Sequence, residues 1–307
     1  MAQLTTKDST ALVCTLWPRG LPQYVKGSYD LGQLYEQRRV VPRHEDAFRD
    51  WCYIATDCEQ EDKTRCKFLA YMGVNTDYAE EVSVRMQGFV QAVHLGVYGT
   101  WNGTSSQGKV IEAVQAITLG GGCARAVFNV QMEAVTALRR FASEQVGGRY
   151  EGKRTPKQIE FTAPVFRKVH PTETEYVLPP ADPMNNYVTQ ATAMRREWAV
   201  VNGVRIGVQE QNVVRRASAM EIRKGDFVDV TATLSIRVKR QYNSKQVYVT
   251  FKPIQVVRLA TAAIVKNVVV EKTLQTEDMM NTEGDRAGPS LTITRPRKIA
   301  PQVDTDL

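Results

Sequence analysis

Basic and aromatic side chains gather in one stretch of the chain, residues 224–259, which reads KGDFVDVTATLSIRVKRQYNSKQVYVTFKPIQVVRL. Lys and Arg can pair with phosphate groups, and the flat ring of Tyr can stack on another flat ring. Between Arg237 and Lys252 the side chains of these kinds are Arg237, Lys239, Arg240, Tyr242, Lys245, Tyr248 and Lys252. The chemistry that they predict is the non-covalent binding of a polyanion that carries flat rings.

Two β-strands are expected to position these side chains. Val228 and Val230 alternate with polar residues, so one face of the first strand is apolar and the other is polar. Arg237 and Lys239 follow at the same spacing and are expected to share a face. Pro253 lies inside the second strand and predicts an edge position or a bulge there.

Three residues elsewhere are further candidates for the same chemistry. Trp101 lies in a loop of Asn, Gly, Thr and Ser, where burial is expected to be difficult, so it is predicted to stack on a base. Arg215 and Arg216 are predicted to contact phosphates. Other roles stay open for all these residues: a Lys-rich edge strand that resists aggregation, core packing of the rings, or solvated charge.

Motifs for catalysis or metal binding are not found in the sequence. The five cysteines contain no Cys-x-x-Cys pair, and the spacing of Cys52, Cys58 and Cys66 is not that of a zinc site. The phosphate-binding, nucleophile-elbow and zinc-protease motifs are missing, and the glycines at 120–122 have only the spacing of a turn. We therefore expect no enzyme activity, no cofactor and no metal.

Chain length and net charge indicate the number of domains and the kind of partner. The 307 residues suit one large or two small domains, and a net charge of +7 favours a polyanionic partner. Residues 195–259 hold 13 Lys and Arg against 5 Asp and Glu, whereas residues 1–80 hold 10 against 12. Unpaired cysteines and an N-terminus without a signal peptide predict an intracellular protein, and the lack of a long apolar run predicts no membrane partner.

A second strand–loop–strand pattern precedes the basic one. Residues 86–119 and 223–259 share a Gly, a Phe-Val pair, an aromatic-Asn pair in the loop and a closing Leu, which suggests an internal repeat with a spacing of about 140 residues. Helical spacing predicts a helix near 131–145. Asn202-Gly203 predicts a tight hairpin between two short strands, and the segment 147–195 is expected to hold a strand or two, such as residues 159–166.

The stretch at 224–259 resembles a segment of the OB-fold proteins that bind single-stranded DNA. Gly225, Val228, Val230 and Leu234 match the first strand of that segment. The basic, aromatic-bearing loop follows, and the second strand closes at Leu259. The resemblance covers about 36 residues and implies a small β-barrel with a groove in which cations track phosphates and rings stack on bases.

We therefore expect a mostly-β (α+β) protein with two OB-like barrels. The expected parts are an N-terminal domain at 1–146, a linker at 147–195, a C-terminal domain at 196–272 and a disordered tail at 273–307. The expected function is binding of single-stranded DNA or RNA in replication, repair or recombination, with a homo-oligomer or proteins of those processes as further partners. The alternatives are a β-sandwich subunit of a viral capsid or nucleocapsid, and a protein–protein adaptor.

Overall fold

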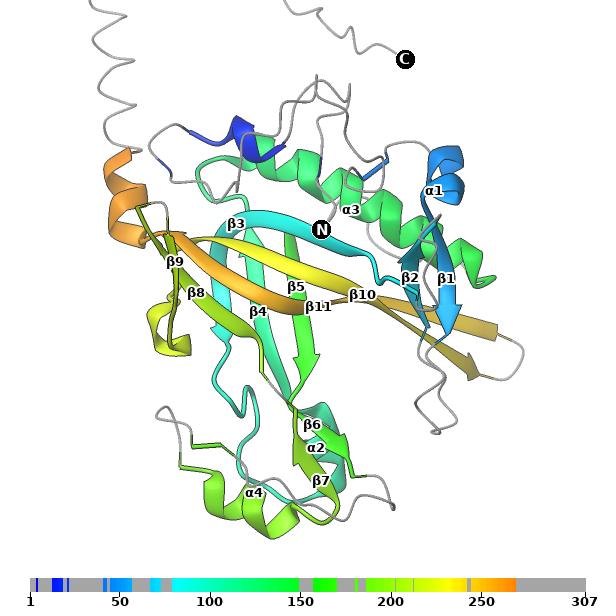
Figure 1. Ribbon diagram of the computed structural model, residues 1–307, viewed down its shortest axis with the longest axis vertical. Coiled ribbons are helices and arrows are strands. Elements are labelled where there is room, and N and C mark those ends of the chain that lie inside the picture. The colour runs from blue at the N-terminus through cyan, green and yellow to red at the C-terminus, as the bar shows by residue number, and fades with distance from the viewer. Residues whose placement is uncertain are drawn as a thin grey trace, which may run out of the picture. The chain divides into compact units, whose positions relative to one another are not determined.

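Most of the strands of this protein belong to one sheet, as its computed structural model shows (Figure 1). The structure describes residues 4, 13–18, 21, 41–42, 45–56, 67–72, 79–148, 157–169, 180–181, 186–201, 203–211, 213–241 and 244–268. For residues 14, 15, 45, 239–241, 244 and 245 it describes the backbone alone. All described residues lie in one compact unit, Met1–Val268. The predicted tail at 273–307 lies outside the described residues.

The described part of the sheet contains nine strands, and a separate pair of short strands lies apart from it. The sheet consists of β1 (Cys52–Thr56), β2 (Lys67–Tyr71), β3 (Ser83–His94), β4 (Val114–Gly120), β5 (Gln158–Pro164), β8 (Arg205–Glu210), β9 (Val213–Arg216), β10 (Phe227–Gln241) and β11 (Ser244–Ala260). The separate pair is β6 (Phe166–Lys168) with β7 (Trp198–Val200). The labelled helices are α1 (Glu45–Trp51), α2 (Gln107–Glu112), α3 (Arg125–Gln145) and α4 (Val188–Met194), with 3-10 turns η1 (Val13–Leu16) and η3 (Ala219–Glu221), and a further helical segment covers residues 262–268. The prediction of a mostly-β protein is confirmed.

Five strands of the sheet pair in a closed ring. Strand β3 pairs with β4, β4 with β5, β5 with β11, β11 with β10, and β10 again with β3. The β5–β11 pair is parallel, and the other four are antiparallel. Both hairpins that the sequence suggested as a repeat therefore belong to the same ring. Two separate barrels are not confirmed, and the predicted domains at 1–146 and 196–272 contribute strands to one sheet.

Apolar side chains fill the interior of the ring. Ile117 from β4, Phe161 from β5, Leu234 from β10 and Phe251 from β11 are fully buried, and the last two lie opposite each other. Helix α3 packs its apolar face against the same core, and the guanidinium group of Arg139 stands 4.7 Å from the centre of the Phe251 ring. The core is thus shared by strands from both halves of the sequence, which holds the β10–β11 hairpin firmly at its base.

The outer side of β3 and the first half of β10 is covered. The ring of Trp17 packs edge-on against Phe227 with centroids 4.7 Å apart. Beside them the Arg85 guanidinium donates to the buried carboxylate of Asp229 at 2.6 Å, and the Gln87 amide donates to the same carboxylate at 2.9 Å. This part of the exterior is therefore closed by the chain itself, and an external ligand must use another part.

A small lobe with its own core projects from the ring (Figure 1). It consists of the β3–β4 connection, residues 95–113, together with β6, β7 and α4. Its core contains Tyr98, Trp101, Phe166 and Met194. Buried Gln115 joins the lobe to the ring: its amide donates to the Leu95 and Gly96 carbonyls at 3.2 and 2.9 Å and accepts from the Val204 N–H at 3.1 Å.

Several predictions for local structure are confirmed and others are wrong. Both hairpins are present, and the helix expected at 131–145 extends over Arg125–Gln145. The stretch 159–166, expected to be a strand, lies in β5 and the start of β6, and the sheet has a bulge beside Pro253. The hairpin expected at Asn202-Gly203 is wrong, because β7 pairs with β6 while β8 pairs with β9 and β11. Among the described residues no helix is long and apolar enough to span a membrane.

Candidate nucleic-acid interface

The exposed outer side of the β10–β11 hairpin brings a cation and an aromatic ring together. Leu234 and Ile236 are fully buried in the ring, so the odd-numbered residues of this part of β10 face outward. Arg237 is one of them and lies directly opposite Tyr248 on β11. Because directly opposite residues share a face, the two side chains are neighbours. Lys252, four residues further along β11, lies on the same face and is exposed.

Strands β8 and β9 extend this face beyond β11. Val256 points into the core, so Gln255 faces outward, and Arg205 on β8 lies directly opposite Gln255. Two residues later, Gly207 lies opposite Arg216 on β9. Arg205 and Arg216 are both exposed and therefore belong to the same outer surface. We call the set Arg205, Arg216, Arg237, Tyr248 and Lys252 the cationic face.

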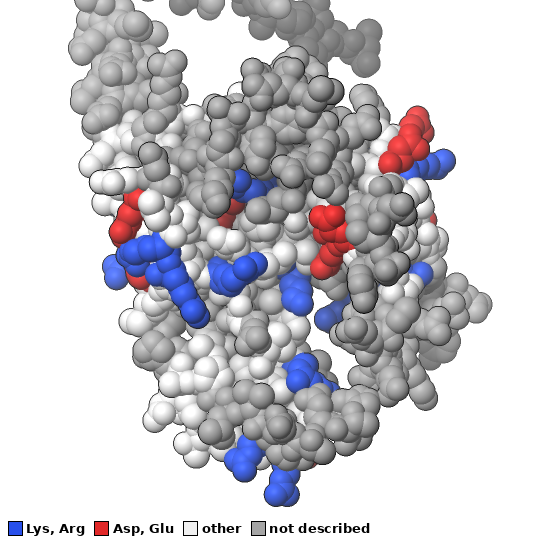
Figure 2. Space-filling view, viewed as in Figure 1, with Lys and Arg blue, Asp and Glu red and all other residues white. Residues whose placement is uncertain are grey.

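Charge and exposure on the cationic face suit an anionic ligand. Tyr248 is 48% exposed, and its hydroxyl group donates to the Gln246 side-chain oxygen at 2.8 Å, which leaves the flat sides of the ring to other contacts. Figure 2 shows Lys and Arg in a row over β9, β8 and β11, while Asp and Glu lie in the upper half of the view. Glu160 on β5 is an exposed acidic neighbour of this surface.

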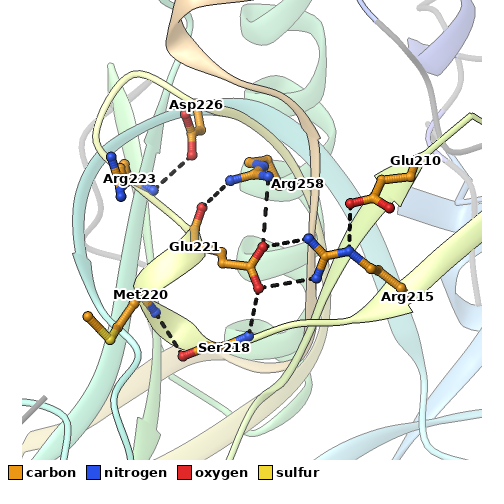
Figure 3. A network of polar contacts seen from close by, with 8 residues as sticks. All are labelled: Glu210, Arg215, Ser218, Met220, Glu221, Arg223, Asp226 and Arg258. Atoms are coloured by element: carbon orange, nitrogen blue, oxygen red, sulfur yellow. Dashed lines mark hydrogen bonds and ion pairs between the residues drawn. The ribbon is translucent and has the colours of Figure 1, made fainter. Parts of the chain in front are cut away.

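The structure corrects the prediction for Arg215, which lies on the opposite side of β9 from Arg216. Its guanidinium group pairs with Glu210 at 2.6 Å and with Glu221 at 2.8 Å (Figure 3). These hydrogen bonds raise the pKa of Arg215, and the bond from Arg215 is the main cause of the lowered pKa of Glu221. Two carboxylates therefore balance this charge, and Arg215 holds the β8–β9 hairpin on the turn at η3 instead of facing a phosphate.

The same network fastens the turn to β11. Ser218 and Glu221 form a reciprocal cap of η3, in which the Ser218 hydroxyl accepts from the Met220 N–H and the Glu221 carboxylate accepts from the Ser218 N–H. Arg258 of β11 donates to the Glu221 carbonyl oxygen at 2.5 Å (Figure 3). These contacts fix the position of β9 and with it the outward direction of Arg216.

The prediction for Trp101 is also wrong, because its ring is 4% exposed in the core of the lobe. Phe166 packs edge-on against it at 4.9 Å, Tyr187 at 5.5 Å, and the indole N–H donates to the Thr104 carbonyl at 2.9 Å. The side chain is thus enclosed by the protein, and stacking on a base is not available to this residue.

For three further predicted residues the structure describes the backbone alone, and a fourth lies outside the described residues. Lys239 lies opposite Gln246, and Arg240 opposite Lys245, so three of them occupy paired positions at the tip of the hairpin. Nothing beyond these backbone positions is described for Lys239, Arg240 and Lys245. Tyr242 lies outside the described residues, and its role in stacking stays a prediction.

Sequence reasoning missed three residues of this surface. Arg205 was not selected because it begins a short strand with no basic neighbour. Phe68 on β2 lies opposite Ser235, and the exposed Tyr53 on β1 shares that face through the β1–β2 pairing. Only the pairing of β2 with β10 brings these rings beside the hairpin, so no local pattern could have found them.

The described residues include two free thiols, Cys52 and Cys123. They contain no group of three His, Cys, Asp or Glu placed to hold a metal ion. Burial raises the pKa of Cys52 to about 12, so this thiol stays protonated and is a poor nucleophile. Cys123 is exposed, in the turn before α3.

Comparison with known proteins gives one structural likeness to report. No protein-family model matches the chain, and no curated protein matches it. Among solved structures, the single-stranded DNA-binding protein from bacteriophage Enc34, in complex with single-stranded DNA, matches with a TM-score of 0.26 and 13% identity. The match covers 58% of this chain and 86% of that one.

Proposed function

We propose that this protein binds single-stranded nucleic acid on the cationic face, without catalysis. The observation that carries the proposal is the exposed ring of Tyr248 beside Arg237 and Lys252, with Arg205 and Arg216 continuing the same surface. A ring stacked on a base contributes about 1–3 kcal/mol, and the surrounding cations can follow the phosphates on either side.

A single strand fits this surface better than a duplex does. Stacking on Tyr248 requires a base whose flat side is free, and in a duplex the flat sides are already stacked on neighbouring pairs. The proposed contacts come from side chains on a sheet, so binding requires no helix that enters the groove of a duplex. Binding of this kind depends weakly on base sequence, since every base has a flat side.

We also propose that the protein has an OB-like fold, and the closed ring of five strands supports this. We read it as one barrel in which the β3–β4 and β10–β11 connections take the places of the loops that bind oligonucleotides in OB folds. The β3–β4 connection belongs to the small lobe, and the β10–β11 connection is the tip of the basic hairpin. Protection or delivery of strands in replication, repair or recombination is the role that such binding would serve.

A titration of the full chain into a fluorescently labelled oligo-dT tests the proposal. Anisotropy of the label is the suitable signal, because three of the four tryptophans, Trp17, Trp51 and Trp101, are buried and would report poorly on a surface ligand. We expect tight binding of the single strand, weaker binding of a duplex of equal length, and an affinity that falls steeply with salt. Equal affinity for both forms, or assembly into large particles without binding, would favour a structural protein instead.

A further inference from the structure

The small lobe carries a second set of cations close to an aromatic ring. Lys168 on β6 lies directly opposite Trp198 on β7, so the two side chains share a face of this two-stranded sheet. Lys168 is exposed and Trp198 is half-buried, with part of its ring against the core of the lobe. Arg195 and Arg196 lie in the turn between α4 and β7, and neither has a carboxylate partner among the described residues.

The lobe is mostly positive over the described residues. Besides the three cations named above it contains Arg167 and Lys109, and the charge of Lys109 is balanced by Glu112 at 3.1 Å. Glu197 is the remaining acidic residue there. In Figure 2 the lower part of the molecule, where β6, β7 and α4 lie, shows Lys and Arg and no Asp or Glu.

Strand order places the lobe next to the cationic face. Strands β5 and β8 both run parallel to β11 and follow each other along it, since Phe161 lies opposite Phe251 and Arg205 lies opposite Gln255. The chain leaves β5 at Pro164, forms β6, α4 and β7, and returns at Arg205. The lobe therefore emerges beside β11 between the levels of Phe251 and Gln255, where Lys252 and Arg205 also lie.

We propose that the lobe is a second contact for the same nucleic-acid strand, made by Lys168, Arg195, Arg196 and the exposed part of Trp198. This inference rests on the proposed function and deepens it. A strand that stacks on Tyr248 and passes Lys252 and Arg205 is led toward the cations of the lobe, and Glu160 is an exposed acidic residue beside this path. The hydrogen bonds of Gln115 hold the lobe in place, so the two surfaces form one extended binding path.

The test compares short and long oligo-dT, of about 8 and about 30 nucleotides, which lie within and above the range of about 4–16 nucleotides for a site on one OB fold. The double variant K168A/R196A removes two exposed cations from the lobe. With the long strand we expect the slope of log affinity against log salt to become shallower by about 1.4, because each lost phosphate contact removes about 0.7. With the short strand, which the cationic face alone can hold, the slope should stay the same.

The matched control R49A/R125A removes two exposed cations from α1 and α3, away from the lobe. It should leave both slopes unchanged. An unchanged slope for K168A/R196A on the long strand, or an equal change in the control, overturns the second contact while short-strand binding still supports the proposed function. If the unmodified protein binds neither strand, the proposed function fails and the inference fails with it.

Discussion

Arg215 and Arg216 are neighbours in the sequence, and the structure predicts opposite results when each is replaced by Ala. Arg216 faces outward on the cationic face, whereas Arg215 faces the other way and pairs with Glu210 and Glu221. R216A should therefore weaken binding of a single strand and flatten its salt dependence. R215A should leave the salt dependence unchanged and lower the melting temperature, because it unfastens β9 from the turn at η3.

The size of the effect follows from the number of cations. Four cations on the cationic face give a slope of about −2.8 for log affinity against log salt, at about −0.7 for each phosphate contact. A short oligo-dT should then bind about 50-fold more weakly at 200 mM than at 50 mM salt. With Arg216 removed the slope becomes about −2.1, and the same change in salt should weaken binding about 20-fold.

The assay is an anisotropy titration at four salt concentrations, run in parallel on the unmodified protein, R216A and R215A. Thermal unfolding of each variant shows whether a change in affinity reflects a loss of folded protein. The reasoning is refuted if R215A flattens the slope as much as R216A does, because the strand pairing would then not decide which arginine meets the phosphates.

Three further changes test other parts of the account. Y248A should weaken binding about 5- to 150-fold, the range expected for about 1–3 kcal/mol of stacking, whereas Y248F keeps the ring and should bind normally in the same titration. D229A leaves the Arg85 charge without its buried carboxylate and should lower the free energy of unfolding by about 3–5 kcal/mol in a urea titration; a loss below about 1 kcal/mol would contradict this. The lowered pKa of Glu221 means that its carboxylate stabilises the fold above about pH 4.3 and that this contribution disappears as the pH falls further. The melting temperature of E221Q should accordingly lie below that of the unmodified protein at pH 7 and approach it at pH 3, and a gap that widens at low pH would count against the role of the pair with Arg215.

Local pattern was sufficient to predict the strands of both hairpins and most of α3. Alternation of apolar and polar residues predicted β10, and helical spacing after residue 131 predicted the buried side of α3. Arg237, Tyr248 and Lys252 were selected from the same strand pattern, and the structure shows them exposed on β10 and β11, while their role in binding stays a prediction. The face and spacing of residues along one strand or helix depend on that element alone, so one sequence is enough to predict them.

Properties that depend on long-range pairing could not be predicted in this way. The loop around Trp101 is polar in sequence, yet Phe166 and Tyr187 from distant segments enclose the ring. The similar hairpins suggested two barrels because nothing local shows that β10 pairs with β3. The faces of Arg215 and Arg216 likewise depend on the register of β9 against β8.

Photocrosslinking tests the central claim most directly. An oligo-dT substituted with 5-iodouracil, bound to the full chain and irradiated, reacts with aromatic side chains that stack on its bases, and mass spectrometry identifies the peptide. The account predicts a crosslink at Tyr248, reduced by excess unlabelled single strand and absent in Y248A. Crosslinks that fall only on strands remote from the cationic face, with Tyr248 unmodified in a fully bound sample, would contradict it.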